Sequence, residues 1–207
     1  MLRRTLLVLA LFAAAQFGGV FADVIEANNV SVDQGEDALV VSADFRFELN
    51  PRLEEALNNG VALYFAVEFE LVRPRWYWFD EIAASEKRSL RLAYHTLSRQ
   101  YRVSRGALHQ NFPSLAEALR TLGTVRDWAV VERERLNPEQ GYVAALRMRL
   151  DTALLPKPFQ VSALTSREWT LASEWVKVTF TSKNAGKDAG KDARKDARKD
   201  AGEDPAQ

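Results

Sequence analysis

The chain of 207 residues contains no cysteine. This absence excludes disulfide bonds, cysteine-ligated metal sites and a cysteine nucleophile. Histidine is also scarce, with two residues, so a zinc site built from clustered histidines is not expected. We therefore expect no cofactor, no metal and no catalytic residue, and a fold that is stable through its hydrophobic core alone.

Long apolar runs are missing outside the N-terminus. Arg3 and Arg4 precede an apolar run over residues 6–15, and residues 20–22 (Val-Phe-Ala) fit a small-residue cleavage site before Asp23. The run is short for a membrane span, and an uncleaved anchor helix is the alternative to a cleaved signal peptide. We expect residues 1–22 to be a signal peptide and residues 23–181 to form one exported, soluble periplasmic domain.

Aromatic and β-branched residues are absent after Thr181, and Lys-Asp-Ala recurs every four residues from Lys187. Such a segment has nothing to bury, so we expect residues 182–207 to be a disordered tail. Basic residues are scarce in residues 23–72, which hold eleven acids and two bases, whereas residues 73–182 hold seventeen bases and eleven acids. The split predicts that the acidic first third pairs with the basic remainder, or that a basic face serves an anionic partner.

Alternation of apolar and polar residues is the main structural signal in the chain. Residues 61–72 place Leu63, Phe65 and Val67 on one side of a strand, and residues 38–49, 90–96 and 142–150 alternate in the same way. Short helices are indicated after Asn50-Pro51 and after Ser114, where capping residues precede apolar stripes. The pattern predicts a mainly β protein: an antiparallel β-sandwich, or a curved barrel, of about eight strands with two short helices.

Other segments lead to more local expectations. Residues 24–32 and 38–49 form a hairpin, residues 80–87 form a polar turn, and residues 99–103 and 128–135 are strands. The residues from Pro156 to Pro158 are a stiff extended connection, and residues 159–164 and 169–180 are the final strands. The apolar phase shifts near residues 173–175, which predicts a β-bulge there.

Seven short stretches stand out along the chain: Leu-Asn-Pro at 49–51, Leu-Asn-Asn-Gly at 57–60, Phe-Glu-Leu at 69–71, Arg-Pro-Arg-Trp-Tyr-Trp at 73–78, Tyr-His at 94–95, Ser-Arg-Gln-Tyr-Arg-Val at 98–103 and Leu-Leu-Pro-Lys-Pro-Phe-Gln-Val at 154–161. Together they resemble the domain of unknown function 4390 family. The resemblance covers residues 24–181 and implies an exported protein of proteobacteria. It implies no activity and no catalytic residue.

Arginines interleaved with aromatic residues are the most function-like set. Such side chains can hold phosphate, carboxylate or a peptide, although arginine stacked on tryptophan is also ordinary packing at a strand edge. Nucleic acid is not expected as a partner of an exported protein, whereas peripheral membrane contact fits aromatics at an interface. The candidate binding surface consists of Arg73, Arg75, Trp76, Trp78, Arg99, Tyr101 and Arg102, with Arg105 nearby.

Two weaker signals would belong to a hydrolase. Glu68 and Glu70 share one strand face about 7 Å apart, which is within the range of inverting glycosidases. We expect them instead to face arginines across the sheet, with Arg91, Arg147 and Arg149 as candidates. His95 lies in a strand without a nucleophile motif, so a structural role is favoured over a catalytic triad.

The sequence thus favours a non-enzymatic exported domain that binds a protein partner, such as the outer domain of a membrane protein. The alternative is binding of an anionic ligand or a lipid headgroup through the arginine and tryptophan set, and a hydrolase is third.

Overall fold

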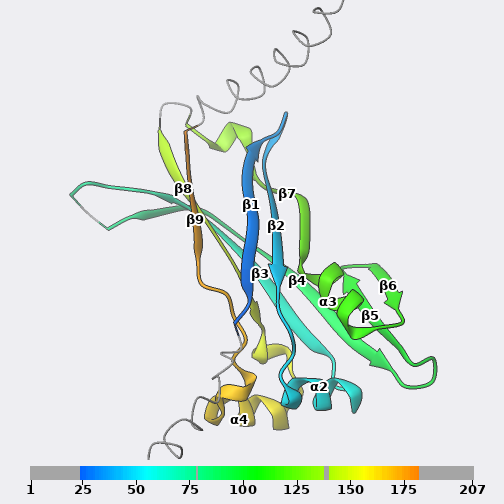
Figure 1. Ribbon diagram of the computed structural model, residues 1–207. Coiled ribbons are helices and arrows are strands. Elements are labelled where there is room, and N and C mark those ends of the chain that lie inside the picture. The colour runs from blue at the N-terminus through cyan, green and yellow to red at the C-terminus, as the bar shows by residue number, and fades with distance from the viewer. Residues whose placement is uncertain (1–23, 78, 138–139, 182–207) are drawn as a thin grey trace, which may run out of the picture.

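The computed structural model describes residues 24–77, 79–137 and 140–181, which form two antiparallel sheets (Figure 1). The predicted signal peptide and tail lie outside the described residues. The smaller sheet has the order β1-β2-β7 and the larger one β6-β5-β4-β3-β8-β9. Both sheets are open, so the sandwich expected from the sequence is confirmed and the curved barrel is not. The strands are β1 (Glu26–Gln34), β2 (Ala38–Arg46), β3 (Leu63–Arg73), β4 (Glu81–His95), β5 (Gln100–Arg105), β6 (Leu108–Phe112), β7 (Thr124–Glu132), β8 (Gly141–Leu150) and β9 (Val176–Thr181).

Strand β3 is the centre of the larger sheet, with β4 on one side and β8 on the other. Its alternate residues Leu63, Phe65, Val67, Phe69 and Leu71 are fully buried, as the alternation predicted. They face the smaller sheet, where Leu39 and Val41 of β2 and Trp128 of β7 are buried. The rings of Phe69 and Trp128 meet edge to face with centroids 6.5 Å apart. The core therefore lies between the two sheets.

The described residues form three α-helices: α2 (Pro51–Asn58), α3 (Leu115–Gly123) and α4 (Lys157–Thr165). The predicted caps are present, since Asn50 Oδ1 accepts from the Leu53 N–H at 2.9 Å and Ser114 Oγ accepts from the Glu117 N–H at 3.3 Å. Gly123 ends α3 against β2, where a β-carbon would lie 2.1 Å from the Phe45 carbonyl oxygen. No helix in the described part of the chain is long and apolar enough to cross a membrane.

The polar turn expected over residues 80–87 is wrong, because β4 begins at Glu81 and runs for 15 residues. Its first half is polar yet pairs with β3 throughout, with Glu81 opposite Arg73 and Lys87 opposite Glu68. Pairing with an established neighbour outweighs the weak strand propensity of this segment. The short strand β6, which pairs with β5, was not predicted.

The last third of the domain departs most from the expected strands. Residues 157–165 form α4, and a 3₁₀ helix, η3 (Arg167–Trp169), follows. Pro158 stands in the first turn of α4, where its missing N–H costs nothing, so a proline read as a connection begins a helix. The strand expected over residues 169–180 starts only at Val176 and has no bulge at residues 173–175. Instead, the Ser173 N–H donates to the Met148 carbonyl oxygen at 2.8 Å, and the Ser173 hydroxyl oxygen accepts from the Met148 N–H at 3.0 Å.

Candidate functional site

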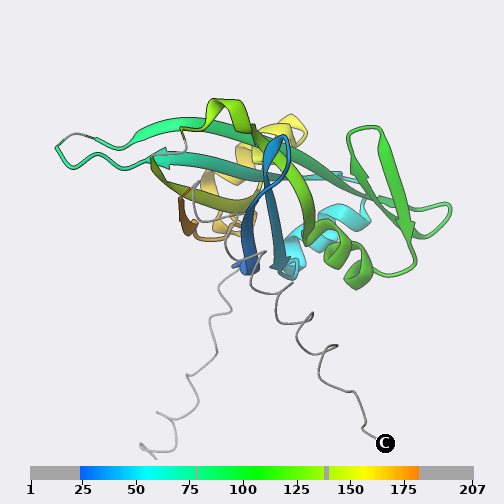
Figure 2. The same cartoon turned by 90° about the horizontal axis from the view of Figure 1, so that it is seen from above.

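The connection between β3 and β4, residues 73–82, forms an arm that reaches beyond the edge of β8 and β9 (Figures 1 and 2). Its large apolar side chains are exposed: Trp76 by 93%, Tyr77 by 69%, Phe79 by 86% and Ile82 by 59%. The rings of Trp76 and Tyr77 meet at 4.8 Å with an interplanar angle of 70°. Trp78 lies outside the described residues. The arm thus presents apolar surface to solvent on an extension that the core does not need.

The arginines of the arm are engaged by its own carboxylates. Arg73 and Arg75 both form ion pairs with the same oxygen of Glu81. Arg73 also donates to Gln140 Oε1 at 3.2 Å, and the Arg75 N–H donates to Asp80 Oδ1 at 3.3 Å. Two arginines face two carboxylates, so the arm is close to neutral. Its chemistry is that of aromatic side chains, not that of a basic patch.

The other half of the predicted surface lies at the opposite end of β4. His95 pairs with Gln100, so Arg99, Tyr101 and Arg102 are separated from the arm by the length of this strand, about 45 Å for 15 residues. Arg102 donates to Asn111 Oδ1 at 3.0 Å, and the Tyr101 hydroxyl donates to Asn58 Oδ1 at 3.3 Å. Burial raises the pKa of Tyr101. The six described candidate residues therefore do not form one surface, because they lie at opposite ends of strand β4.

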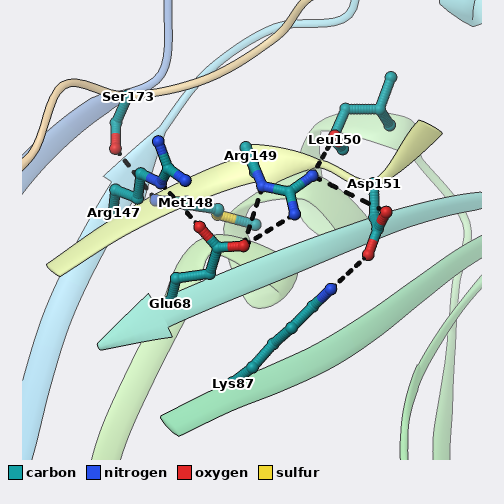
Figure 3. Close-up of polar contacts among 8 residues, drawn as sticks. All are labelled: Glu68, Lys87, Arg147, Met148, Arg149, Leu150, Asp151 and Ser173. Carbon is teal, nitrogen blue, oxygen red and sulfur yellow. Dashed lines mark hydrogen bonds and ion pairs between the residues drawn. The ribbon is translucent and has the colours of Figure 1, made fainter. Parts of the chain in front are cut away.

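A charged network covers the outer face of the larger sheet (Figure 3). Glu68 on β3 accepts from Arg147 at 2.7 Å and from Arg149 at 2.8 Å, both on β8. Asp151 continues the chain of contacts, 3.7 Å from Arg149 and 2.6 Å from Lys87 on β4. The guanidinium of Arg147 also lies 4.4 Å from the Trp175 ring centroid. This network ties β3, β4 and β8 together on the side away from the core.

The electrostatics of the network decide its chemistry. Burial raises the pKa of Glu68, but hydrogen bonds from Arg149 and Arg147 outweigh this and lower it overall. Burial also raises the pKa of Asp151, but the hydrogen bond from Lys87 outweighs this effect and the pKa is lowered overall. A general acid needs a carboxyl whose pKa is raised, so Glu68 is held in the opposite state. The expected pairing of Glu68 with Arg147 and Arg149 is confirmed, and Arg91 takes no part in it.

The remaining chemical candidates are dispersed. His95 and His109 are exposed on different strands. Within residues 24–77, 79–137 and 140–181, no three histidine or carboxylate side chains are grouped closely enough to hold a metal ion. The expectation that Glu70 also faces an arginine is wrong, because Glu70 lies opposite Ala145 and Ser85 and forms no ion pair among the described residues.

A family model described as a domain of unknown function, DUF4390, matches residues 22–179. The chain belongs to the DUF4390 family. Searches of curated proteins and of solved structures found no match. Both sheets, the arm and the charged network of this DUF4390 domain lie almost entirely within the matched residues, which confirms the resemblance that the sequence carries.

Proposed function

We propose that this DUF4390 protein is a non-enzymatic domain, exported to the periplasm, that binds a protein partner through the arm. The outer domain of a membrane protein is the kind of partner that fits this location. The exposure of Trp76, Tyr77 and Phe79 at the tip of an extension carries the proposal. Tryptophan and tyrosine are enriched among the residues that dominate the binding energy of protein interfaces.

The charge of the arm favours protein over an anionic membrane surface. Juxtamembrane segments that bind anionic lipid gain about 1 kcal/mol for each free basic side chain. Arg73 and Arg75 are already paired with Glu81, so they offer little of this attraction. An aromatic tip with balanced charge matches the apolar centre of a protein interface, whose rim alone is charged.

The N-terminal sequence supports export. Arg3 and Arg4 followed by the apolar residues 6–15 provide the charge and hydrophobicity of a signal peptide. Immunoblotting of periplasmic and cytoplasmic fractions, with a mass measurement of the purified protein, tests this part. A full-length protein retained in the cytoplasm would contradict it.

Site-specific crosslinking in cells tests the arm directly. A photoreactive amino acid at Tyr77 is expected to yield one adduct whose partner is identified by mass spectrometry and then confirmed with the two purified proteins. The double substitution Trp76→Ser, Phe79→Ser should abolish the purified interaction. Leu97→Ser, Leu108→Ser is the matched control, because these leucines are exposed elsewhere. Equal binding by both double variants, or arm-dependent binding to vesicles with no protein adduct, would overturn the proposal.

A further inference from the structure

A notch opens where β5 leaves the edge of β4. Strand β5 pairs with β4 from Leu90 to His95, so β4 has no neighbour on that side from Glu81 to Ser89. Beside this edge lies a cleft of about 720 Å³, which we call the notch. Side chains from both faces of the sheet line it, because the sheet ends there. They include Arg88, Arg91 and Arg105, the hydroxyls of Ser89 and Ser104, and the ring of Trp128.

The notch contains positive charge without matching negative charge. No aspartate or glutamate is among its described lining residues. Its lysine, Lys87, is bound by Asp151 at 2.6 Å, but Arg88, Arg91 and Arg105 form no ion pair within the described part of the chain. This is the reverse of the arm and of the Glu68 network, where each arginine has a carboxylate.

Two of the three arginines of the notch, Arg88 and Arg105, contact uncharged groups. The Arg88 guanidinium lies 4.7 Å from the Trp128 ring centroid, and Arg105 donates to the Thr124 carbonyl oxygen at 3.1 Å. Burial and the neighbouring charge of Arg105 lower the pKa of Arg88, so the two guanidinium groups are close enough to repel. Arg88 and Arg105 are partly buried and repel each other, so they gain more from a bound anion than freely moving surface cations do, whereas Arg91 is exposed.

We propose that the notch binds a phosphate-type oxyanion, either a free phosphate compound or a phosphate group on a lipid. Guanidinium groups present paired N–H donors that match two phosphate oxygens, and serine hydroxyls supply further donors. The rings of Tyr64 and Trp128 also line the notch, on opposite faces of the sheet. The site lies on the body of the sandwich, away from the arm, and does not depend on the proposed protein partner.

Pyrophosphate titration is the first test, with tryptophan fluorescence as one readout and calorimetry as the other. The intact protein is expected to bind in a salt-dependent manner. The double substitution Arg91→Gln, Arg105→Gln should weaken binding about tenfold or more, because two charge-assisted contacts are lost. Arg135→Gln, Arg167→Gln removes the same charge at exposed sites outside the notch and should bind normally. Ser104→Ala, which keeps all charges, should weaken binding to a smaller degree.

A second experiment distinguishes a free phosphate compound from a phosphate group on a lipid. The fraction of protein that sediments with vesicles is measured for phosphatidylglycerol in phosphatidylcholine and, for comparison, for phosphatidylcholine alone. Binding to the anionic vesicles that pyrophosphate displaces identifies a lipid headgroup, and pyrophosphate binding without vesicle binding identifies a free ligand. Circular dichroism confirms that each variant is folded. Absence of binding to both probes, or equal losses in the notch and control variants, would overturn the proposal.

Discussion

The arm and the notch both place arginines on the β3–β4–β5 part of the larger sheet, yet their electrostatic states are opposite. Arg73 and Arg75 in the arm share Glu81, whereas Arg88, Arg91 and Arg105 in the notch have no carboxylate partner among the residues that the structure describes. The arm's exposed surface is aromatic and that of the notch is cationic. The arm holds two arginines and the notch three, so the number of arginines does not explain the opposite states. What differs is the register, which puts an acid opposite one group and not the other.

Removing the carboxylate from a paired group should have the largest effect on stability. Glu68→Gln leaves the partly buried Arg147 without a counter-ion and leaves Arg149 with only the more distant Asp151, at 3.7 Å. We expect the free energy of unfolding to fall by about 2 kcal/mol, less than for a fully buried pair because both arginines contact solvent. Urea unfolding followed by circular dichroism measures it, and Glu86→Gln, at an exposed position of β4, is the control.

Acid should remove the same interaction in the unmodified protein. The pKa of Glu68 and that of Asp151 are lowered in the folded state, so between the folded and unfolded pKa values the unfolded chain binds more protons. Their stabilisation is present above roughly pH 4.5 and is lost as the pH falls through the folded pKa values. Urea midpoints near pH 7 and near pH 3 should therefore differ less in Glu68→Gln than in the wild type. Equal acid sensitivity in the two proteins would contradict the role of Glu68.

Converting the arm into a notch-like surface tests the comparison directly. Glu81→Gln frees Arg73 and Arg75 while leaving the aromatic residues unchanged. Because these side chains are about one-third exposed, we expect a stability loss of at most about 1 kcal/mol. The variant should gain binding to anionic vesicles that high salt abolishes, as measured by sedimentation. Unchanged vesicle binding would show that the arm arginines were not neutralised by Glu81.

Converting the notch into an arm-like surface should have the smallest effect on stability. Ser89→Glu places a carboxylate on the open edge of β4, among Arg88, Arg91 and Arg105. We expect unfolding to become more costly by about 0.5 kcal/mol, the size of an exposed ion pair, while pyrophosphate binding falls. Calorimetry and urea unfolding measure the two changes. A variant that binds pyrophosphate as well as the wild type would place the anion elsewhere.

The sequence predicted the parts of the fold that follow from local periodicity. The alternation of Phe65, Val67 and Phe69 identified the buried face of β3, and Asn50 and Ser114 identified helix starts. The partners of Glu68 were also found, because Arg147 and Arg149 occupy the outward positions of an alternating strand. In each case a side chain's neighbours could be derived from the two-residue or four-residue period of its own element.

The features that decide the candidate sites depend instead on pairing between segments. Glu81 neutralises the arm only because it lies opposite Arg73, and residues 80–87 alone resemble a turn. One signal was present: Lys87 opposite Glu68 and Glu81 opposite Arg73 are complementary charges at paired positions of the two strands of a hairpin. No such signal showed that Arg88, Arg91 and Arg105 lie away from carboxylates. That prediction requires knowing where β5 ends and where Trp128 packs.

The position of β3 has a consequence for how the chain reaches its native state. The hairpin of β3 with β4 joins segments that are close in the sequence. The other edge of β3 pairs with β8, which is distant in the sequence, as in the pairing of Phe65 with Leu150. The smaller sheet has the same order of events, because Ala38 in β2 pairs with Glu132 in β7. Closing such distant pairs is slow, and until then both central strands expose unpaired apolar edges. A chain that is made or exported from its N-terminus onward therefore needs protection from aggregation until residues 124–150 are available for pairing.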